Sequence, residues 1–420
     1  MLPGMKMDQQ TETTETREMN LAMARRIQQT LGQFGIPVTM GDIFRGPTMT
    51  RFELETAPGI RVEQIMSLAA DLTAALKTEC HIAGPIPGRS CLGVDVANAS
   101  KERVLLSQLW ESQEWKTTEG RLPVALGRDI YNRVVVADLA DMPHLLIAGR
   151  VNSGKSTFVD ALVASLLSRF SPGQVRFVMV DLNVIELQHY NGLPHLIGPV
   201  VTHLGQAPLA LQWMVNEMAN RYQLLAEAGA GNIASFNRAP KPGVRKTHAV
   251  PPFEKICATP EGFFVASDAL QSSRQAEPGL AGELPYLVLI LNEPAELMLS
   301  APMEAELAIS RLAQMGRDVG IHCILATRDA SSETLTQKIR ANFPARAALR
   351  VACKADSRLV LNAPGAEKLL GQGDMLFLAP DSYQAPRIEA PYISAQEVSE
   401  IVSEYCATTS EPHATTQQRP

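Results

Sequence analysis

Two hydrophobic patterns divide the chain near residue 115. Before that point, apolar residues recur at helical spacing over residues 19–34 and 60–76, and they alternate with polar residues over 48–55. Alternation of this kind is typical of a strand with one wet face. The first part of the chain is therefore predicted to be a small α+β domain over residues 19–115, and the polar stretch at 111–120 is expected to be a linker or loop.

The second part of the chain consists of short apolar runs separated by longer segments of helical spacing. These runs are continuous rather than alternating, which is typical of strands in a parallel sheet that helices cover on both faces. We therefore predict a doubly wound α/β domain with a parallel-rich sheet over residues 116–406. The runs cover residues 144–149, 175–181, 286–292, 322–327, 347–352 and 374–379.

Three polar segments fall outside these patterns. Residues 1–18 and 407–420 are expected to be disordered tails, and residues 239–285, which mix Pro, Gly, Ser and charges, are expected to be an insertion. The N-terminus has no apolar core of a secretory signal, and no run approaches the roughly 18 apolar residues that span a bilayer. A cytoplasmic protein with no membrane segment of its own is expected.

Composition and charge restrict the function only loosely. Hydrophobic residues make up 45% of the 420 residues and charged residues 20%, which are ordinary globular values. The six cysteines are scattered without a CxxC pair, so we expect reduced thiols rather than a zinc site or a disulfide framework. A net charge of −6 disfavours coating of nucleic acid by the whole surface, but it allows a locally basic lining.

The clearest chemical signal is the segment GRVNSGKS at residues 149–156, which matches the phosphate-loop pattern GxxxxGK[ST]. An apolar strand precedes it and an amphipathic helix follows, so backbone N–H groups and the positive helix end can face phosphate oxygens. We expect Lys155 to contact the β- and γ-phosphates and the Ser156 hydroxyl to ligate Mg²⁺. The residues expected to bind ATP and Mg²⁺ are Gly149, Asn152, Ser153, Gly154, Lys155, Ser156, Thr157 and Asn292.

A second apolar run, residues 287–291, ends in Asn292, Glu293 and Pro294. Glu293 is the candidate carboxylate for polarising an attacking water, and Pro294 favours an extended backbone at Glu293. The Asn292 amide can hydrogen-bond Ser156 or a metal-bound water, but it cannot give the metal a negative charge. Nucleotide binding is therefore expected, and the rate of hydrolysis stays open.

Several segments, in order along the chain, resemble the FtsK/SpoIIIE family of DNA translocases over about residues 45–395. The sequence MPHLLIAG at 142–149, followed by SGKS at 153–156, matches the family's motor. Further similar segments lie at 50–60, 175–181, 192–196, 215–222, 311–322, 353–358 and 365–376.

The resemblance implies a RecA-like ATPase domain in a homo-hexameric ring that surrounds double-stranded DNA and hydrolyses ATP between subunits. Arg317 occupies the family's position for an arginine that contacts the γ-phosphate held by a neighbour. Arg340, Lys354 and Arg358 match the family's basic positions that face DNA. Residues 338–358 would line the channel and bind phosphates without reading bases, because the stretch carries several cations and one acid. These residues are Lys338, Arg340, Arg346, Arg350, Lys354, Arg358 and the acid Asp356.

The chain also departs from the family. Asn292 stands where the family has an acid, and Asn183 replaces a lysine. Arg328 replaces a glutamine that senses the nucleotide, and Asp329 replaces an arginine that faces DNA. The resemblance does not extend to the membrane segment or the winged-helix module of longer members, so a soluble motor without its own sequence guidance is expected.

Three functions remain open at this point. The first is an ATP-driven translocase of double-stranded DNA, and the second is a degenerate ATP-binding ring or scaffold with slow or absent hydrolysis. The third is a related ring motor that moves protein or single-stranded DNA. A catalytic triad is disfavoured because the histidines of the strand and loop segments have no evident Ser or Cys partner, so structural roles are expected for them. These histidines are His144, His195 and His322.

Overall fold

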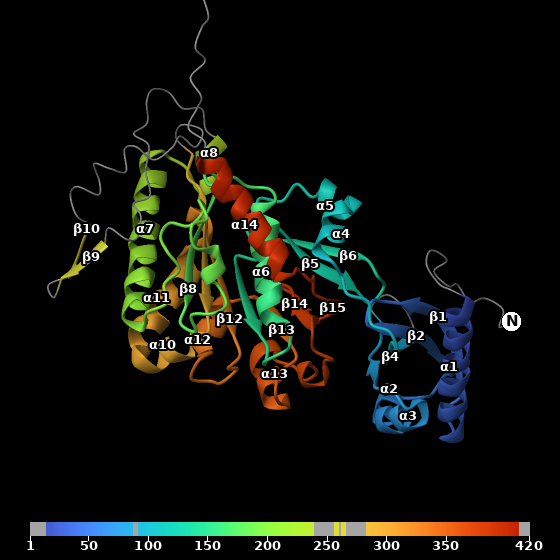
Figure 1. Ribbon diagram of the computed structural model, residues 1–420. Coiled ribbons are helices and arrows are strands. Elements are labelled where there is room, and N and C mark those ends of the chain that lie inside the picture. The colour runs from blue at the N-terminus through green and yellow to red at the C-terminus, as the bar shows by residue number, and fades with distance from the viewer. Residues whose placement is uncertain (1–13, 87–90, 239–255, 260–261, 266–282, 411–420) are drawn as a thin grey trace, which may run out of the picture.

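The computed structural model describes residues 14–86, 91–238, 256–259, 262–265 and 283–410. They form a small α+β domain and a larger α/β domain, connected through residues 98–105 (Figure 1). The fold class and the order of the two domains agree with the sequence prediction. Residues 1–13 and 411–420 and most of the expected insertion at 239–285 lie outside the described residues.

The small domain is a four-stranded antiparallel sheet, in the order β1-β2-β4-β3, covered by helices. Its core joins Ile27 and Leu31 of α1 to Phe52 and Leu54 of β2. Helix α1 begins at Thr14, so residues 14–18 are helical rather than part of the expected disordered tail. The elements are α1 (Thr14–Gln33), β1 (Val38–Arg45), β2 (Met49–Thr56), α2 (Val62–Ser67), α3 (Ala69–Leu76), β3 (Cys80–Ala83) and β4 (Cys91–Ala97).

The expected linker at 111–120 begins at the last residue of the short helix α4 (Leu106–Glu111) and contains a second short helix, α5 (Gln113–Thr117). Leu109 and Trp115 are buried in the core of the larger domain, which is why this polar stretch is ordered. The Ser112 hydroxyl accepts a hydrogen bond from the Trp115 N–H and caps α5.

The larger domain is built on a nine-stranded sheet in the order β6-β5-β15-β14-β13-β7-β12-β11-β8. The five strands from β13 to β8 are parallel, and the other four are antiparallel. The strands are β5 (Pro123–Asp129), β6 (Val134–Asp138), β7 (His144–Ala148), β8 (Val175–Asp181), β11 (Tyr286–Asn292), β12 (Ile321–Thr327), β13 (Ala345–Leu349), β14 (Asp374–Leu378) and β15 (Arg387–Glu389).

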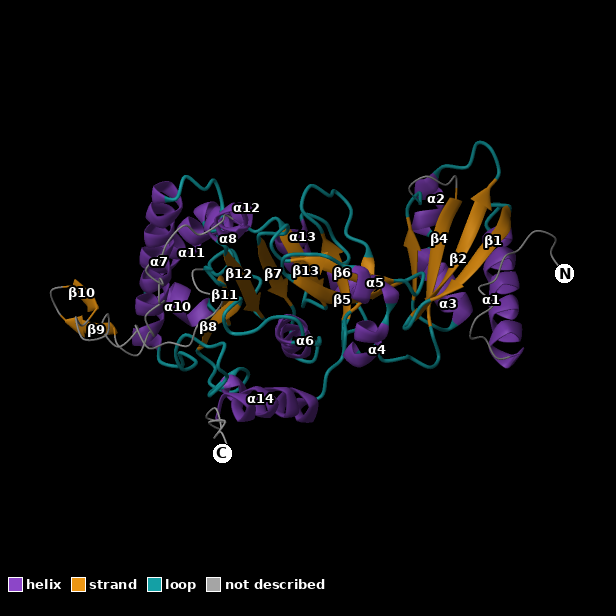
Figure 2. Cartoon of the chain, turned by 90° about the horizontal axis from the view of Figure 1, so that it is seen from above, coloured by secondary structure: helices purple, strands orange, loops and turns teal. Residues whose placement is uncertain are grey.

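Helices cover both faces of this sheet (Figure 2). Alternate residues of β7 belong to separate cores: Leu145 and Ile147 pack with α6, whereas Leu146 and Ala148 pack with α7 and α11. The helices are α6 (Lys155–Leu167), α7 (Ala207–Glu227), α8 (Ile233–Arg238), α10 (Ala295–Ser300), α11 (Pro302–Met315), α12 (Gln337–Asn342), α13 (Lys354–Leu361) and α14 (Ala395–Ser410). A separate hairpin of β9 (Ile256–Thr259) and β10 (Gly262–Val265) falls within the expected insertion, and α14 continues four residues into the expected C-terminal tail.

Polar contacts connect the small domain to the larger one. The Thr48 hydroxyl donates to Glu389 Oε2 at 3.1 Å, and the Arg51 guanidinium donates to the Tyr131 hydroxyl at 3.1 Å. Arg51 is held in the small domain by Asp95 at 2.7 Å. The end of β15 therefore contacts the loop between β1 and β2.

Candidate functional site

The phosphate loop connects the end of β7 to the start of α6. Asn152 and Gly154 adopt positive φ angles of 62° and 99°, a conformation that turns successive N–H groups toward one concave side. A Cβ on Gly149 would lie 2.5 Å from Ser153 Oγ, so the close approach requires glycine there. Among the described side chains, Ser153 Oγ is buried without a hydrogen-bond partner, which fits a loop shaped to hold phosphate oxygens.

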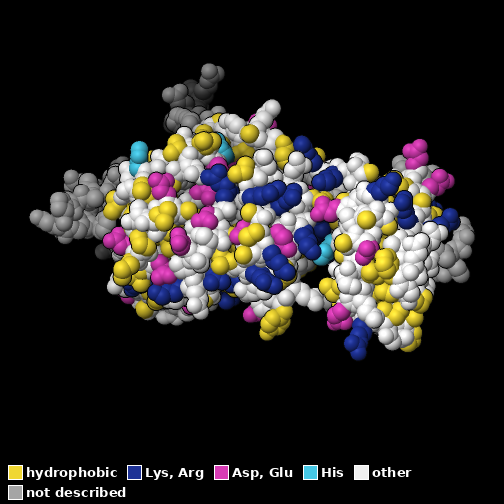
Figure 3. All heavy atoms as spheres, turned by 90° about the horizontal axis from the view of Figure 1, so that it is seen from below, with side chains coloured by type: hydrophobic (Ala, Val, Ile, Leu, Met, Phe, Trp, Pro, Cys, Tyr) yellow, Lys and Arg dark blue, Asp and Glu magenta, His cyan; other side chains and the backbone are white. Residues whose placement is uncertain are grey.

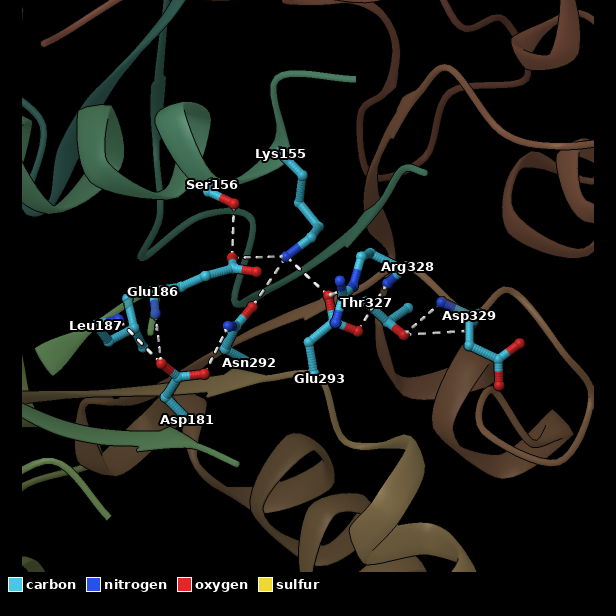
Figure 4. A network of polar contacts seen from close by, with 10 residues as sticks. All are labelled: Lys155, Ser156, Asp181, Glu186, Leu187, Asn292, Glu293, Thr327, Arg328 and Asp329. Atoms are coloured by element: carbon cyan, nitrogen blue, oxygen red, sulfur yellow. Dashed lines mark hydrogen bonds and ion pairs between the residues drawn. The ribbon is translucent and has the colours of Figure 1, made fainter. Parts of the chain in front are cut away.

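Lys155 is buried and stands at the centre of a polar network (Figure 4). Its Nζ lies 3.0 Å from Asn292 Oδ1, 3.0 Å from Glu293 Oε1 and 3.1 Å from Glu186 Oε2. The structure therefore brings the phosphate-loop lysine together with Asn292 and Glu293, at the edge of the sheet where β7 and β11 end.

Asn292 has a fixed amide orientation in this network. Its Nδ2 donates to Asp181 Oδ1 at 2.9 Å, so its carbonyl oxygen faces Lys155. Asp181, at the end of β8, is fully buried, and its other oxygen accepts from the N–H groups of Glu186 and Leu187. Asp181 thus fixes both the amide of Asn292 and the course of the loop that follows β8.

Glu186 is a site residue that the sequence did not predict. Its Oε2 accepts from Ser156 Oγ at 2.6 Å and from Lys155 Nζ at 3.1 Å, so it contacts both groups expected to hold phosphate and Mg²⁺. Burial opposes ionisation, but the hydrogen bond from Ser156 and the charge of Lys155 together lower the pKa of Glu186 below its ordinary value. Glu186 is therefore an ionised carboxylate beside the phosphate loop.

Glu293 has a left-handed backbone, with φ of 53°, so the extended conformation expected from Pro294 is wrong. The Glu293 N–H donates to the Ala326 carbonyl of β12 at 2.8 Å. This bond continues the β11–β12 ladder, so the chain leaves the strand direction at Glu293 itself, and the carboxylate contacts both Lys155 and Arg328. A left-handed non-glycine residue costs on the order of 1–3 kcal/mol and is typical of functional sites.

Arg328 and Asp329, the two departures in the loop after β12, have different roles. Arg328 donates to Glu293 twice, through its N–H at 3.0 Å and its Nε at 2.9 Å. The Asp329 carboxylate accepts from the hydroxyls of Ser331 and Thr334 at 2.8 and 2.6 Å. Arg328 therefore acts on the candidate catalytic carboxylate, whereas Asp329 stabilises the local turn.

Arg317 lies at the amino ends of the parallel strands, whereas Lys155 lies at their carboxyl ends. It begins the short helix 317–319, which directly precedes β12, whereas the phosphate loop follows the end of β7, parallel to β12. The Arg317 side chain is exposed. Arg317 therefore does not join the phosphate site of its own chain.

The basic residues of 338–358 divide into surface and interior groups. Lys354 and Arg358 are exposed one turn apart on α13. The face of the molecule seen from below carries several groups of Lys and Arg side chains (Figure 3). The Arg340 Nε instead donates to the Leu335 carbonyl at 3.0 Å.

The expectation that this whole stretch lines a channel is wrong for Arg346. Its guanidinium is buried and donates to the carbonyls of Phe343, Val360 and Arg340. Lys338 is exposed, but it forms an ion pair with Glu306 at 3.0 Å. Charge counted along the sequence therefore overstates the cations that the surface offers.

The three singled-out histidines are buried and bond to the backbone, as structural roles predict. His144 Nδ1 accepts from the Cys323 N–H, His322 Nδ1 lies 2.9 Å from the Pro143 carbonyl, and His195 Nε2 lies 2.8 Å from the Phe170 carbonyl. Burial lowers the pKa of His144 to about 3 and those of His195 and His322 to about 4.

The fold and this site define a RecA-like P-loop ATPase. In the solved structures, the pCW3 conjugation coupling protein TcpA matches with a TM-score of 0.55 and 19% identity over 91% of this chain and 99% of that one. The cytoplasmic domain of the Thermomonospora curvata type VII secretion ATPase EccC matches with a TM-score of 0.53 and 22% identity over 71% of this chain and 32% of that one. These likenesses show the fold.

The chain belongs to the FtsK/SpoIIIE family. The sequence model of that family matches residues 105–341, and the model of the FtsK alpha domain matches residues 2–98. DNA translocase FtsK of Haemophilus influenzae is 40% identical over 91% of this chain and 70% of its own length. The Rhizobium meliloti protein of the same name is 39% identical over 90% of this chain but only 42% of its own.

The described residues contain no helix that is both long and apolar enough to span a membrane.

Proposed function

We propose that this chain is an ATP-dependent translocase of double-stranded DNA that acts as a homo-hexameric ring. The observation that carries the proposal is the set of contacts made by Lys155 Nζ, which lies 3.0 Å from Glu293 Oε1. Lys155 begins the helix that follows β7, and Glu293 follows β11, which lies two positions from β7 in the sheet. The residue expected to hold the terminal phosphates and the residue expected to act on water thus share one site. The relatives named DNA translocase FtsK support the cargo.

The residues of the site fit Mg²⁺ and ATP. When bound, ATP supplies the phosphoryl group for transfer, and Mg²⁺ supplies positive charge that offsets the negative charge of the phosphates. Ser156 offers a hydroxyl ligand, and the Asn292 carbonyl can hydrogen-bond a metal-bound water. Lys155 exchanges its side-chain partners for phosphate oxygens, and Glu293 orients a water through its carboxylate.

The position of Arg317 supports action between subunits. Arg317 and Lys155 lie at opposite ends of the parallel strands. Arg317 can therefore serve a phosphate site only in another copy of the chain. In a closed ring, each contact joins one surface of a subunit to a different surface of its neighbour. Every phosphate site can therefore receive one arginine from the neighbouring subunit.

Lys354 and Arg358 are the proposed DNA contacts, because both are exposed at the edge of the sheet where the phosphate loop lies. Arg340 keeps this role in the proposal, although its guanidinium already has backbone partners. Binding through phosphates predicts affinity that falls steeply with salt and varies little with sequence. Equal affinity for single-stranded DNA in a salt titration would favour a different cargo.

The decisive measurement is steady-state ATP turnover with and without linear duplex DNA. Wild type is expected to turn over ATP faster with duplex, Lys155→Ala to lose turnover because it loses the phosphate contact, and Glu293→Gln to lose turnover while still binding ATP. Wild-type protein that binds ATP but shows no turnover with any duplex would contradict the proposal.

A second function, a slowly hydrolysing ATP-binding ring or scaffold, is favoured by one observation. Asn292 brings no charge to the site, and Arg328 already occupies Glu293 Oε1 at 2.9 Å. In that case Asn292→Asp should raise an initially low turnover. A brisk wild-type rate that Asn292→Asp leaves unchanged would exclude this alternative.

A further inference from the structure

The turn that carries Arg317 is held by two neighbouring residues of α7. The Tyr222 hydroxyl donates to the Met315 carbonyl at 2.7 Å. The Arg221 guanidinium donates to the Val319 carbonyl at 3.0 Å. These two carbonyls lie two residues before and two residues after Arg317 in the sequence. Helix α7 therefore fixes the backbone on both sides of this arginine.

Helices α7 and α11 lie side by side on one face of the sheet (Figures 1 and 2). Met214 and Met218 of α7 share a buried core with Ile309 and Leu312 of α11. The turn follows the end of α11 and precedes β12, at the amino ends of the parallel strands. Apolar side chains thus join the two helices along their length, whereas the two polar contacts from α7 act on the backbone of the turn.

Arg221 is completely buried, which is rare for a charged side chain. Its Nε donates to Glu217 Oε1 at 2.8 Å, one turn earlier on α7. A buried ion pair adds little net stability, because the cost of removing both charges from water offsets their attraction. What this pair does provide is a donor of fixed direction, since the planar guanidinium that Glu217 holds on one side contacts the Val319 carbonyl with another nitrogen.

The turn itself leaves its backbone little freedom. Gly320 has a φ of 71°, and a Cβ there would lie 2.4 Å from a side-chain carbon of Ile233. The Gly320 N–H donates to the Arg317 carbonyl at 3.2 Å, and the Ile321 N–H donates to the Gly316 carbonyl at 2.9 Å. Because the Arg317 side chain is exposed, the direction in which it leaves the surface depends on this backbone.

We propose that Arg221 and Tyr222 are positioning residues for Arg317. They hold the turn so that the Arg317 guanidinium reaches the phosphates bound by the neighbouring subunit. An arginine that stabilises charge on a transferring phosphoryl group must lie within hydrogen-bond distance of its oxygens, and a displacement of about 1 Å can remove much of its effect. This inference rests on the proposed function, because it assumes that Arg317 completes a neighbour's site.

The first test removes single hydroxyl groups from the full chain. Tyr222→Phe keeps the ring and loses the bond to the Met315 carbonyl, and it is expected to lower ATP turnover with duplex DNA about tenfold. Its affinity for a labelled ATP analogue should match that of wild type, because its own phosphate loop is intact. Tyr405→Phe is the matched control. The Tyr405 hydroxyl also donates to a backbone carbonyl, that of Leu167, and its loss should leave turnover unchanged.

Arg221→Lys tests the second contact. Lysine keeps a positive charge beside Glu217 but lacks the planar fork that reaches Glu217 and Val319 together, so a similar loss of turnover is expected. In Arg221→Lys and in Tyr222→Phe, the amides of residues 316–321 should exchange faster with solvent, and those of the phosphate loop should not. If Arg221→Lys does not fold, Tyr222→Phe decides the matter, and unchanged exchange in it would overturn the positioning role.

Mixing of subunits separates positioning of Arg317 from a general loss of stability. Lys155→Ala lacks the phosphate contact but keeps the turn intact, whereas Tyr222→Phe keeps the phosphate loop intact. In an equal mixture, about one quarter of interfaces would join an intact loop to an intact turn. Turnover per chain should therefore exceed that of either protein alone. A defect confined to the chain that carries Tyr222→Phe would instead give less turnover than that protein alone.

The outcomes distinguish this inference from the proposed function. Wild-type turnover in Tyr222→Phe would overturn the positioning role and leave the proposed function intact. A mixture no more active than Tyr222→Phe alone, in rings shown to exchange subunits, would do the same. Wild-type protein that shows no turnover with duplex DNA would overturn the proposed function and this inference with it.

Discussion

At the scale of single residues, Glu186 is the side chain that a phosphate must displace from Lys155 and Ser156. Its carboxylate contacts both groups, and its pKa is lowered, so it is a negative charge where phosphate oxygens are expected. Without Mg²⁺ no metal charge offsets the repulsion between this carboxylate and the phosphates. We expect Glu186→Gln to bind ATP about fivefold more tightly in EDTA, equivalent to about 1 kcal/mol.

The measurement is a fluorescence titration with a labelled ATP analogue in EDTA. Glu296→Gln is the matched control, because Glu296 is an exposed acid on α10 outside the Lys155 network. Unchanged or weaker binding by Glu186→Gln would show that the carboxylate does not compete with the phosphates.

Arg328 restrains the candidate catalytic carboxylate, because its Nε and Lys155 Nζ both contact Glu293 Oε1. Two cations on one oxygen leave that oxygen less free to accept a hydrogen bond from an attacking water. Arg328→Gln removes one of them, and we expect turnover with duplex DNA to rise about fivefold, equivalent to about 1 kcal/mol in the barrier. Arg311→Gln, an exposed change on α11, serves as the control, and a fall in turnover would show that Arg328 contributes directly to the reaction.

The sequence could predict Lys155, Ser156, Asn292 and Glu293, because phosphate loops and strand ends have characteristic local patterns. It could not predict Glu186, which lies five residues beyond β8 in no recognisable motif. Its place depends on hydrogen bonds from the N–H groups of Glu186 and Leu187 to the buried Asp181. Such a contact between chain segments leaves no periodic signal.

At the scale of elements, the buried strands were predictable and their directions were not. The apolar runs of β7, β8, β11 and β12 identify strands, but β14 has a similar run and pairs antiparallel with β13. An apolar run reports burial on both faces, and the connection between strands determines direction. Polar composition likewise hides α5 from a reading of the sequence, because its one large apolar residue, Trp115, is buried in the core of the larger domain.

Strands β7 and β12 bring two buried histidines near each other. Their ring centres are 6.3 Å apart, and burial lowers the pKa of His322 to about 4, below the ordinary 6.5. The unfolded chain therefore binds more protons than the folded chain between these values, and stability falls as pH decreases from about 6.5 toward 4. For His322 alone the loss between pH 7.5 and pH 5 should be about 2 kcal/mol.

Urea unfolding at the two pH values measures this loss. His322→Asn retains a side-chain N–H donor for the Pro143 carbonyl but does not titrate, so it should be less sensitive to the pH change than wild type. His203→Asn, at an exposed position, should behave as wild type does. An equal pH dependence in His322→Asn would mean that other groups cause the acid destabilisation.

At the scale of the whole molecule, the fold decides which charges reach the surface. Counting cations over 338–358 treats Arg346 and Lys354 alike, but the fold buries the first beneath backbone carbonyls and exposes the second on α13. Similarly, Arg221 and Tyr222 of α7 contact the turn that carries Arg317, and no local pattern connects these two segments. Sites assembled from distant segments require the tertiary structure.

Arg317 and Lys155 lie at opposite ends of the parallel strands, and this arrangement leads to a prediction about assembly. If each complete site combines the phosphate loop of one subunit with Arg317 of its neighbour, Lys155→Ala and Arg317→Ala proteins should each be inactive alone. In an equal mixture, about one quarter of interfaces would pair an intact loop with an intact arginine. Turnover should therefore reappear on mixing, with the amount measured across mixing ratios.

The control for this mixture is Lys155→Ala with Glu293→Gln. Lys155 and Glu293 belong to the same chain's site, 3.0 Å apart, so no interface in that mixture regains both groups. Recovery with Arg317→Ala but not with Glu293→Gln would locate the arginine on the neighbouring subunit. Equal recovery in both mixtures would mean that Lys155 and Glu293 do not act together in one chain's site. Absence of recovery in either, in rings shown to exchange subunits, would mean that Arg317 does not complete a neighbour's site.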